Sequence, residues 1–252
     1  MIILDELEFV YVHIPKCGGT SVKLANPNLE LTGVDNGYDQ MSNHVPLAHI
    51  KATDQELYKK ICKYDSFAHV RDPVARFRSA LFEHSRNFLQ LSSSDCDDAS
   101  LLRLAYSVVD VLENNDFPYP EKYEHFTPQH CFIEVDGVCI IKHIGVIGDF
   151  RELNEFFSKG GLHSVIESYN VTYTPKQGLF RCLAKFIQPL VSMLLAPEFK
   201  HKIWNWLISK GLYEVSKENS TDFLVNDPKI INFIRLFYAR DFELYEKFSR
   251  LR

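Results

Sequence analysis

The chain has 252 residues, of which 46% are hydrophobic and 24% charged, and its formal net charge at pH 7 is -5. This composition is typical of a globular protein with one sizeable core, and the negative net charge argues against a general nucleic-acid binder. We therefore predict a single domain over residues 1–252, in which any site for an anion is local.

The compartment is predicted from the ends of the chain, its apolar runs and its cysteines. The N-terminus has no basic segment and reaches an acidic residue at Asp5, so it does not resemble a secretory signal. The longest apolar run, at 186–197, is shorter than the roughly 20 residues that a membrane-spanning helix needs. The six cysteines include no Cys-x-x-Cys pair, so we expect reduced thiols and a cytoplasmic protein.

The apolar pattern predicts two strand–turn–helix units in the first half of the chain. The first has a buried strand at 7–14, which Pro15 stops, then a glycine-containing turn and a helix from about Thr20. The second has a strand at 65–70 and a long helix that runs from Pro73 to about residue 90. Between the two units, a capping-box pattern predicts a helix that begins at Thr53-Asp-Gln-Glu56 and ends near Cys62.

The rest of the chain is expected to be mostly helical. Helices are predicted at 99–113, 150–158 and 161–168, with a hairpin at 131–143 followed by a strand at 144–147. The hairpin turns at Asp136-Gly137, so that Glu134 faces Cys139. One last helix begins at Asp227-Pro228, with an apolar face formed by Ile230, Ile234, Phe237, Leu244 and Phe248. This order favours an α/β fold: a central, mostly parallel β-sheet flanked by helices, with a helical C-terminal part.

The segment 170–212 differs in composition from the rest of the chain. It contains several basic residues but a single acidic residue, Glu198. We expect a helical insertion or lid at about 179–225. The first interpretation is an amphipathic helical hairpin with its lysines in water. The alternatives are an acceptor-binding face for an anionic substrate and a membrane-surface contact at 180–210.

A strand that ends in PKCGGTS and leads into a helix can surround a phosphate with backbone N–H groups. Gly18 and Gly19 let the backbone approach an anion closely. Lys16 adds a flexible positive charge, and Thr20 and Ser21 add hydroxyl donors. The alternative is a tight turn whose glycines serve only to reverse the chain.

The position of the lysine separates this loop from an ATP-binding P-loop. In the motif G-x-x-x-x-G-K-[ST] the lysine follows the glycines and precedes the magnesium-binding hydroxyl. Here Lys16 precedes Gly18 and Gly19. The sequence therefore disfavours a kinase or ATPase of that kind, although a kinase with an altered P-loop stays an alternative.

A second strand end carries matching groups. Arg71 directly follows the strand at 65–70, and Ser79 lies about two turns into the next helix. Two neighbouring strand ends of this kind can hold the two ends of a doubly phosphorylated nucleotide. Arg76 and Arg78, on the same helix, are expected to be solvated charges.

The pair VHIPKCGGTSV at 12–22 and VRDPVARFRSA at 70–80 resembles two motifs of one enzyme family. They are the 5′-phosphosulfate loop and the 3′-phosphate motif of the carbohydrate-type (Golgi-type and bacterial) sulfotransferases, which use 3′-phosphoadenosine-5′-phosphosulfate (PAPS). Weaker echoes occur at 125–129, 144–153 and 238–245. The resemblance implies a P-loop-like sheet. It also implies transfer of a sulfuryl group from PAPS to a hydroxyl, or secondarily an amine, of a glycan or small metabolite, with release of PAP and no required metal.

The resemblance also implies which residues bind the donor. Cys17 stands where the family has Thr or Ser, and we expect it to contribute through its backbone N–H. The residues implied for the 5′ phosphosulfate are Lys16, Cys17, Gly18, Gly19, Thr20 and Ser21, and those for the 3′ phosphate are Arg71 and Ser79.

Transfer to a hydroxyl also needs a base, and a histidine suits that task near neutral pH. We predict His44 as the base, with His49 second, and Lys16 as the group that stabilises charge on the leaving phosphate. His13 and His69 precede the phosphate motifs inside strands and are expected to be hydrogen-bonded core residues. The histidines lack metal-site spacing, so no metal site is predicted. A nucleotide-binding protein of the same fold without turnover is a further alternative.

Overall fold

The computed structural model describes residues 1–26, 34–35, 41–42, 44–89, 97–115, 119–161, 166, 173–175, 213–215 and 221–250. The chain divides into two compact units, one made of Met1–Glu167 with Thr221–Arg252 and the other of Ser168–Ser220. In the second unit, β9 (Tyr173–Pro175) pairs antiparallel with β10 (Tyr213–Val215). Most of the predicted insertion at 179–225, the predicted surface contact at 180–210 and the predicted helix at 161–168 lie outside the described residues.

The first unit is built on a four-stranded sheet in the order β1-β2-β5-β8. β1 runs antiparallel to β2, whereas β2, β5 and β8 are parallel to one another. The fold is therefore mixed α/β with a mostly parallel sheet, as the sequence predicted. The four strands are β1 (Ile2–Leu4), β2 (Phe9–Tyr11), β5 (Asp65–Val70) and β8 (His143–Val146).

Strand β2 is buried on both faces, which explains its unbroken apolar sequence. Phe9 and Tyr11 pack into the core on one face of the sheet. Val10 and Val12 pack into the core on the other. Because successive side chains of a strand point to opposite faces, one short strand joins both cores.

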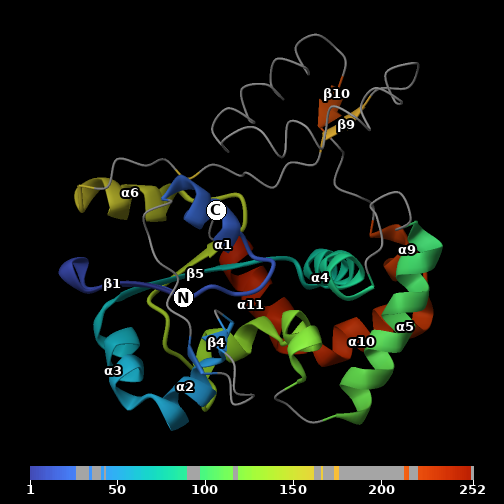
Figure 1. The fold of residues 1–252 in the computed structure, drawn as a ribbon, viewed down its shortest axis with the longest axis horizontal. Coiled ribbons are helices and arrows are strands. Elements are labelled where there is room, and N and C mark those ends of the chain that lie inside the picture. The colour runs from blue at the N-terminus through green and yellow to red at the C-terminus, as the bar shows by residue number, and fades with distance from the viewer. Residues whose placement is uncertain are drawn as a thin grey trace. The chain divides into compact units, whose positions relative to one another are not determined.

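Helices cover both faces of the sheet (Figure 1). Apolar residues that pack with Phe9 and Tyr11 come from α1 (Gly19–Ala25) and α6 (Arg151–Lys159). The opposite face packs against α2, α3 and α11. These three helices span Leu47–Thr53, Gln55–Lys63 and Ala239–Ser249.

A third apolar cluster lies among the helices beyond the sheet, where α4, α5, α9 and α10 pack together (Figure 1). Within it, Phe77 of α4 meets Phe126 at the end of a short 3-10 helix. These elements are α4 (Pro73–Phe88), α5 (Asp98–Asn114), α9 (Asp222–Val225), α10 (Pro228–Phe237) and the 3-10 helix η2 (Glu121–Phe126).

The remaining described elements are short. The hairpin of β6 (Glu134–Val135) and β7 (Val138–Cys139) pairs Glu134 with Cys139, as predicted. Its turn places both Asp136 and Gly137 at positive φ. The others are η1 (Asp5–Leu7), η3 (Gln129–Phe132), and the antiparallel pair β3 (Val34–Asp35) and β4 (Met41–Ser42).

The predicted cap of the helix after residue 53 was wrong by one residue. Asp54 is the N-cap of α3, since its carboxylate accepts a hydrogen bond from the Leu57 N–H at 2.9 Å. Thr53 instead ends α2, where its hydroxyl donates to the carbonyl of His49 at 2.8 Å. His49 therefore lies in a helix and not in a loop with His44.

The single C-terminal helix of the prediction is two helices. Asp227 caps α10 through the N–H groups of Lys229 and Ile230, as expected. At Tyr238 the backbone leaves the helical region, with φ -104° and ψ 24°, and α11 begins at Ala239. The Tyr238 hydroxyl donates to the carbonyl of Phe126 at 2.7 Å, which holds the break against η2.

Among the described helices, none is long and apolar enough to cross a membrane. Four described cysteines are free thiols, at positions 17, 62, 131 and 139.

Candidate functional site

Two loops meet at one edge of the sheet because β2 and β5 are adjacent and parallel. The pairing continues past the end of β2, where the Val12 N–H donates to the carbonyl of Phe67 at 2.8 Å. The chain after β2 then forms the PKCGGTS turn, and the chain after β5 begins with Arg71. The fold thus brings together the two motifs predicted to bind phosphate.

The turn after β2 has a strained backbone, and several of its N–H groups have no partner within the turn. Lys16 has φ 64°, a conformation that costs energy for a residue with a side chain, and Gly18 has φ 95°. The N–H of Cys17 is used inside the turn, bonded to the carbonyl of Ile14 at 3.3 Å. Within the described residues, the N–H groups of Gly18, Gly19 and Thr20 have no acceptor. They are the unpaired donors of the turn, and of these three residues only Thr20 is exposed.

Gly19 is required by the imidazole of His13. A Cβ built on Gly19 would lie 1.9 Å from His13 Cδ2 and 2.0 Å from His13 Nε2. Real Cβ atoms do not approach other atoms so closely, so the ring of His13 occupies the space that a side chain at 19 would fill. The second glycine of the motif therefore has a packing role in addition to any role toward a ligand.

Lys16 is held by an acid that the sequence did not single out. Its Nζ lies 3.2 Å from Oε2 of Glu83 on α4, and both side chains are about a quarter exposed (23% and 25%). Burial alone would raise the pKa of Glu83, but the Lys16 ammonium outweighs it, so the pKa lies below its ordinary value. Lys16 is thus paired with Glu83, and an anion in the turn would compete with Glu83 for it.

Arg71 reaches across to the first loop. Its Nη1 donates to the carbonyl of Lys16 at 3.3 Å, and its side chain is half-buried. Ser79 lies on α4 and is also half-buried, and no hydrogen bond among the described residues joins it to either loop. In the turn itself, Thr20 is exposed, whereas Ser21 is only 2% exposed.

Gln129 joins the two loops, a role that was not predicted for it. Its Oε1 accepts hydrogen bonds from the Arg71 N–H at 2.8 Å and from the Cys17 thiol at 3.1 Å. Its Nε2 donates to the carbonyl of Arg71 at 2.9 Å. Burial raises the pKa of the Cys17 thiol to about 11, so the thiol stays protonated and donates. In this structure Cys17 positions the loop with both its thiol and its N–H.

Arg76 was expected to be a solvated charge, and that expectation was wrong. Its side chain is 1% exposed and is among the largest fully buried ones in the described chain. Its Nε donates to the carbonyl of Pro15 at 3.0 Å, and its Nη2 to the carbonyls of His125 and Thr127 at 3.1 and 2.7 Å. Arg76 thus fixes the PKCGGTS turn to the segment that carries Gln129.

Three histidines gather beside the turn. The ring centroids of His13 and His44 are 4.5 Å apart, and those of His44 and His125 are 5.3 Å apart. Nε2 of His125 lies 3.8 Å from Oε1 of Glu124. His44, predicted as the base, is therefore brought to the Lys16 loop, together with His125, which the sequence did not single out as a site residue.

The hydrogen bond of His44 settles which ring nitrogen can act. Its Nδ1 lies 3.1 Å from the carbonyl oxygen of His13, and a carbonyl can only accept, so Nδ1 carries the proton. In the neutral ring the lone pair is then on Nε2.

All three imidazoles are neutral at neutral pH. Burial and the neighbouring His125 lower the pKa of His44 to about 3, and burial and Lys16 lower that of His125 to about 4. Burial lowers the pKa of His13 as well, well below its ordinary value.

The two histidines expected in the core differ. His69 is a hydrogen-bonded core residue, with Nδ1 3.3 Å from the Tyr11 hydroxyl and Nε2 3.1 Å from the carbonyl of Asp149. His13 is not: within the described residues its buried Nδ1 has no hydrogen-bond partner. The prediction of a hydrogen-bonded core histidine is therefore confirmed for His69 and wrong for His13. His13 lies past the end of β2, where its ring packs on Gly19.

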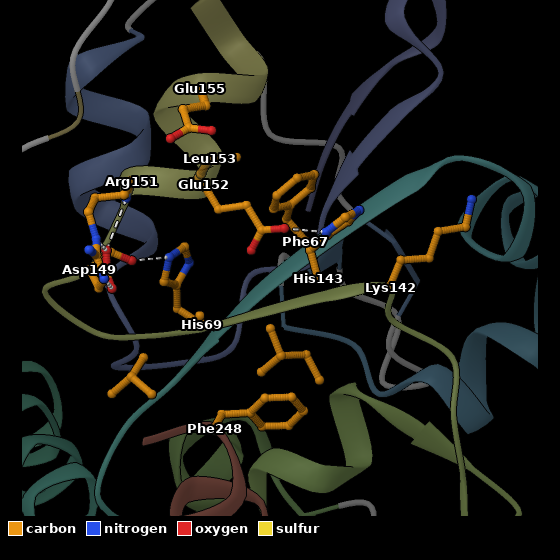
Figure 2. Close-up of a pocket in the computed structure, with 13 residues that line it drawn as sticks. Phe67, His69, Lys142, His143, Asp149, Arg151, Glu152, Leu153, Glu155 and Phe248 are labelled. Carbon is orange, nitrogen blue, oxygen red and sulfur yellow. Dashed lines mark hydrogen bonds and ion pairs between the residues drawn. The ribbon is translucent and has the colours of Figure 1, made fainter. Parts of the chain in front are cut away.

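A cavity of about 470 Å³ lies elsewhere, along β8 and α6. Figure 2 shows Glu152 of α6 directed at His143 of β8, where their atoms lie 2.5 Å apart. The ring of Phe67 stacks on His143, with centroids 4.3 Å apart. Two ion pairs, His143 with Glu152 and Arg151 with Asp149, line the cavity together with apolar side chains. Its lining does not include Lys16, Arg71 or His44.

Comparisons of this chain with protein-family models, with curated proteins and with solved structures found no match.

Proposed function

We propose that the protein is a sulfotransferase that takes a sulfuryl group from PAPS and transfers it to a hydroxyl of a glycan or small metabolite. The observation that carries this proposal is the junction of the two loops at one sheet edge, where the Arg71 guanidinium contacts the Lys16 carbonyl at 3.3 Å. Two cations and a set of unbonded N–H groups then face a ligand that carries phosphate at both ends.

The geometry supports one orientation of the donor. The 5′ phosphosulfate would lie in the P-loop-like turn after β2, against the N–H groups of Gly18, Gly19 and Thr20. The 3′ phosphate would lie against Arg71 and the hydroxyl of Ser79. In this orientation the reacting sulfur would lie on the same side as Lys16, whose ammonium would leave Glu83 for the donor.

The histidine cluster supports a route for the proton. The acceptor oxygen attacks sulfur, the bond between sulfur and the 5′-phosphate oxygen breaks, and PAP leaves. Nε2 of His44 carries the lone pair and takes the acceptor proton. Because the pKa of His44 is about 3, it is a weak base, and the proton moves after the bond from oxygen to sulfur has begun to form and has made the acceptor hydroxyl acidic. Lys16 stabilises the negative charge that develops on the bridging oxygen. The reaction proposed in this way uses no metal.

Transfer from labelled PAPS to a panel of glycans and small hydroxylated metabolites tests the proposal. We expect turnover by the wild-type chain, and a larger loss of transfer than of PAP binding in Lys16→Ala. Tight PAP binding without transfer to any acceptor would favour a non-catalytic nucleotide-binding protein. Magnesium-dependent turnover of ATP would favour a kinase, and either result would overturn the proposal.

A further inference from the structure

Three metal-ligating side chains meet beside the phosphate turn. His44, Glu124 and His125 each offer one ligand atom, and these atoms all lie within 4.8 Å of one another. Glu124 and His125 come from η2, while His44 comes from a segment about 80 residues earlier in the sequence. No spacing motif could have revealed this group, because only the fold brings the two segments together.

His44 is oriented as metal-binding histidines usually are. Such histidines donate the second ring N–H to a carbonyl or carboxylate, which fixes the ring and leaves the other nitrogen for the ion. The Nδ1–H of His44 is donated to the carbonyl of His13 at 3.1 Å. Nε2 is therefore the ligand atom of His44.

The η2 segment is itself held in place, so its two ligands are presented on a fixed backbone. Arg76 donates to the carbonyl of His125 at 3.1 Å and to that of Thr127 at 2.7 Å. The side chains of Glu124 and His125 are 23% and 19% exposed, so an ion can reach them from solvent.

The donor set selects the class of metal. Two imidazole nitrogens and one carboxylate oxygen are ligands that suit zinc and similar divalent ions, and a site with three protein ligands leaves a fourth position open. Zinc bonds of about 2 Å require ligand atoms roughly 3.3 Å apart in a tetrahedral site. Nε2 of His125 and Oε1 of Glu124 are 3.8 Å apart, so small side-chain rotations would bring these two ligand atoms to the spacing of a tetrahedral zinc site.

We propose that His44, Glu124 and His125 bind one zinc ion, and that the bound ion inhibits sulfuryl transfer. The first part of this proposal, zinc binding (the binding half), is argued from the geometry alone. The second part, inhibition of transfer (the inhibition half), rests on the proposed function. Zinc and the acceptor proton need the same lone pair, that on Nε2 of His44. A protein with zinc bound would therefore have no base for the acceptor.

Titration of the metal-free, full-length protein with zinc tests the binding half. We expect one ion per chain by calorimetry, and with cobalt in place of zinc the visible absorption of a four-coordinate ion. Glu124→Gln and His125→Ala should each weaken zinc binding at least about tenfold, the loss seen when a supporting group of a metal site is removed. Glu124→Gln preserves side-chain size, so it keeps the test valid if His125→Ala folds poorly.

His143→Ala is the matched control. It also removes a histidine that contacts a glutamate, at 2.5 Å from Glu152. This pair lies in the β8 cavity and belongs to no cluster of three mutually close ligand atoms among the described residues. Zinc affinity should be unchanged in this variant. Absence of stoichiometric binding by the wild type, or equal affinity in Glu124→Gln, His125→Ala and the wild type, would overturn the metal site.

The inhibition half is tested by the zinc concentration that halves the transfer rate, measured for each protein relative to its own zinc-free rate. We expect this concentration to rise at least about tenfold in Glu124→Gln, in step with the loss of binding. Stoichiometric zinc binding with zinc-insensitive transfer would overturn the inhibition and leave the metal site standing. Zinc binding without any transfer in zinc-free protein would support the metal site and contradict the proposed function.

Discussion

The side-chain amide of Gln129 holds the backbone of Arg71 from both sides, accepting from its N–H at 2.8 Å and donating to its carbonyl at 2.9 Å. The same Oε1 accepts from the thiol of Cys17 in the other loop. Gln129 is anchored in turn, because its N–H donates to the buried carboxylate of Asp241 at 2.7 Å. One side chain therefore sets the separation of the two loops.

Replacing Gln129 should weaken nucleotide binding because it releases the backbone of Arg71 and the thiol of Cys17. Gln129→Leu leaves the N–H and carbonyl of Arg71 unpaired, at a cost of about 1–3 kcal/mol for each buried group. We expect lower affinity for PAP by calorimetry and a lower free energy of unfolding in urea. Gln55→Leu, at an exposed position of α3, is the control. Unchanged PAP affinity in Gln129→Leu would show that the loops hold their positions without it.

Adding a methyl group to Gly19 should damage the turn through His13. In Gly19→Ala the new Cβ would lie 1.9 Å from the ring of His13, so the ring or the turn has to move. Overpacking of this kind costs about 1–3 kcal/mol. The double variant His13→Ala/Gly19→Ala removes the obstacle, and we expect it to recover stability relative to Gly19→Ala in thermal melts. Strictly additive losses would show that the contact with His13 is not the reason for glycine here.

Removing the acid that pairs with Lys16 should tighten donor binding. Glu83 lies 3.2 Å from the ammonium, and an entering phosphosulfate has to displace it. In Glu83→Gln we expect PAP affinity to rise roughly two- to fivefold, since partly exposed ion pairs are worth about 1 kcal/mol or less. Glu113→Gln, an exposed acid on α5, controls for the change in net charge. A loss of affinity in Glu83→Gln would mean that Glu83 orients Lys16 for the ligand.

The pair of His130 and Asp241 should make stability depend on pH in the alkaline range. Burial alone would lower the pKa of His130, but the Asp241 carboxylate at 2.9 Å and the Cys131 sulfur at 3.7 Å together outweigh burial and raise the pKa from 6.5 to about 10. A pKa raised by folding stabilises the folded state fully below pH 6.5, and this contribution is lost as the pH rises through about 10.

Urea unfolding of the wild type and of His130→Gln between pH 6 and 10 measures this contribution. We expect the difference in unfolding free energy between the two proteins to shrink as the pH rises. A constant difference over the whole range would show that His130 does not carry a proton in the folded state.

The sequence predicted the parts of the fold that depend on local pattern. The strand at Asp65–Val70 and the helix that starts at Pro73 were predicted correctly, because a short apolar run and an Asp-Pro cap are local signals. The break at Tyr238 was missed, because a tertiary contact with the carbonyl of Phe126 accompanies it. The pattern of apolar residues along the sequence contains no information about such a tertiary hydrogen bond.

The candidate site shows the same division. The glycines of the turn and the cations Lys16 and Arg71 are recognisable in the sequence because each follows a strand. Arg76 and Glu83 were not, because side chains on a helix at these spacings are usually solvated, and only packing against other segments gives them partners. Pairing of strands β2 and β5 brings the two loops together, and the side-chain network between them had to be seen in three dimensions.

The most direct test of the central claim is calorimetric titration of the metal-free protein with PAP and, separately, with adenosine 5′-monophosphate, which lacks the 3′ phosphate. If both strand ends hold one nucleotide, PAP binds once per chain and more tightly than the monophosphate, and Arg71→Ala removes most of that difference. Equal affinity for the two nucleotides, or no binding of PAP, would contradict the account.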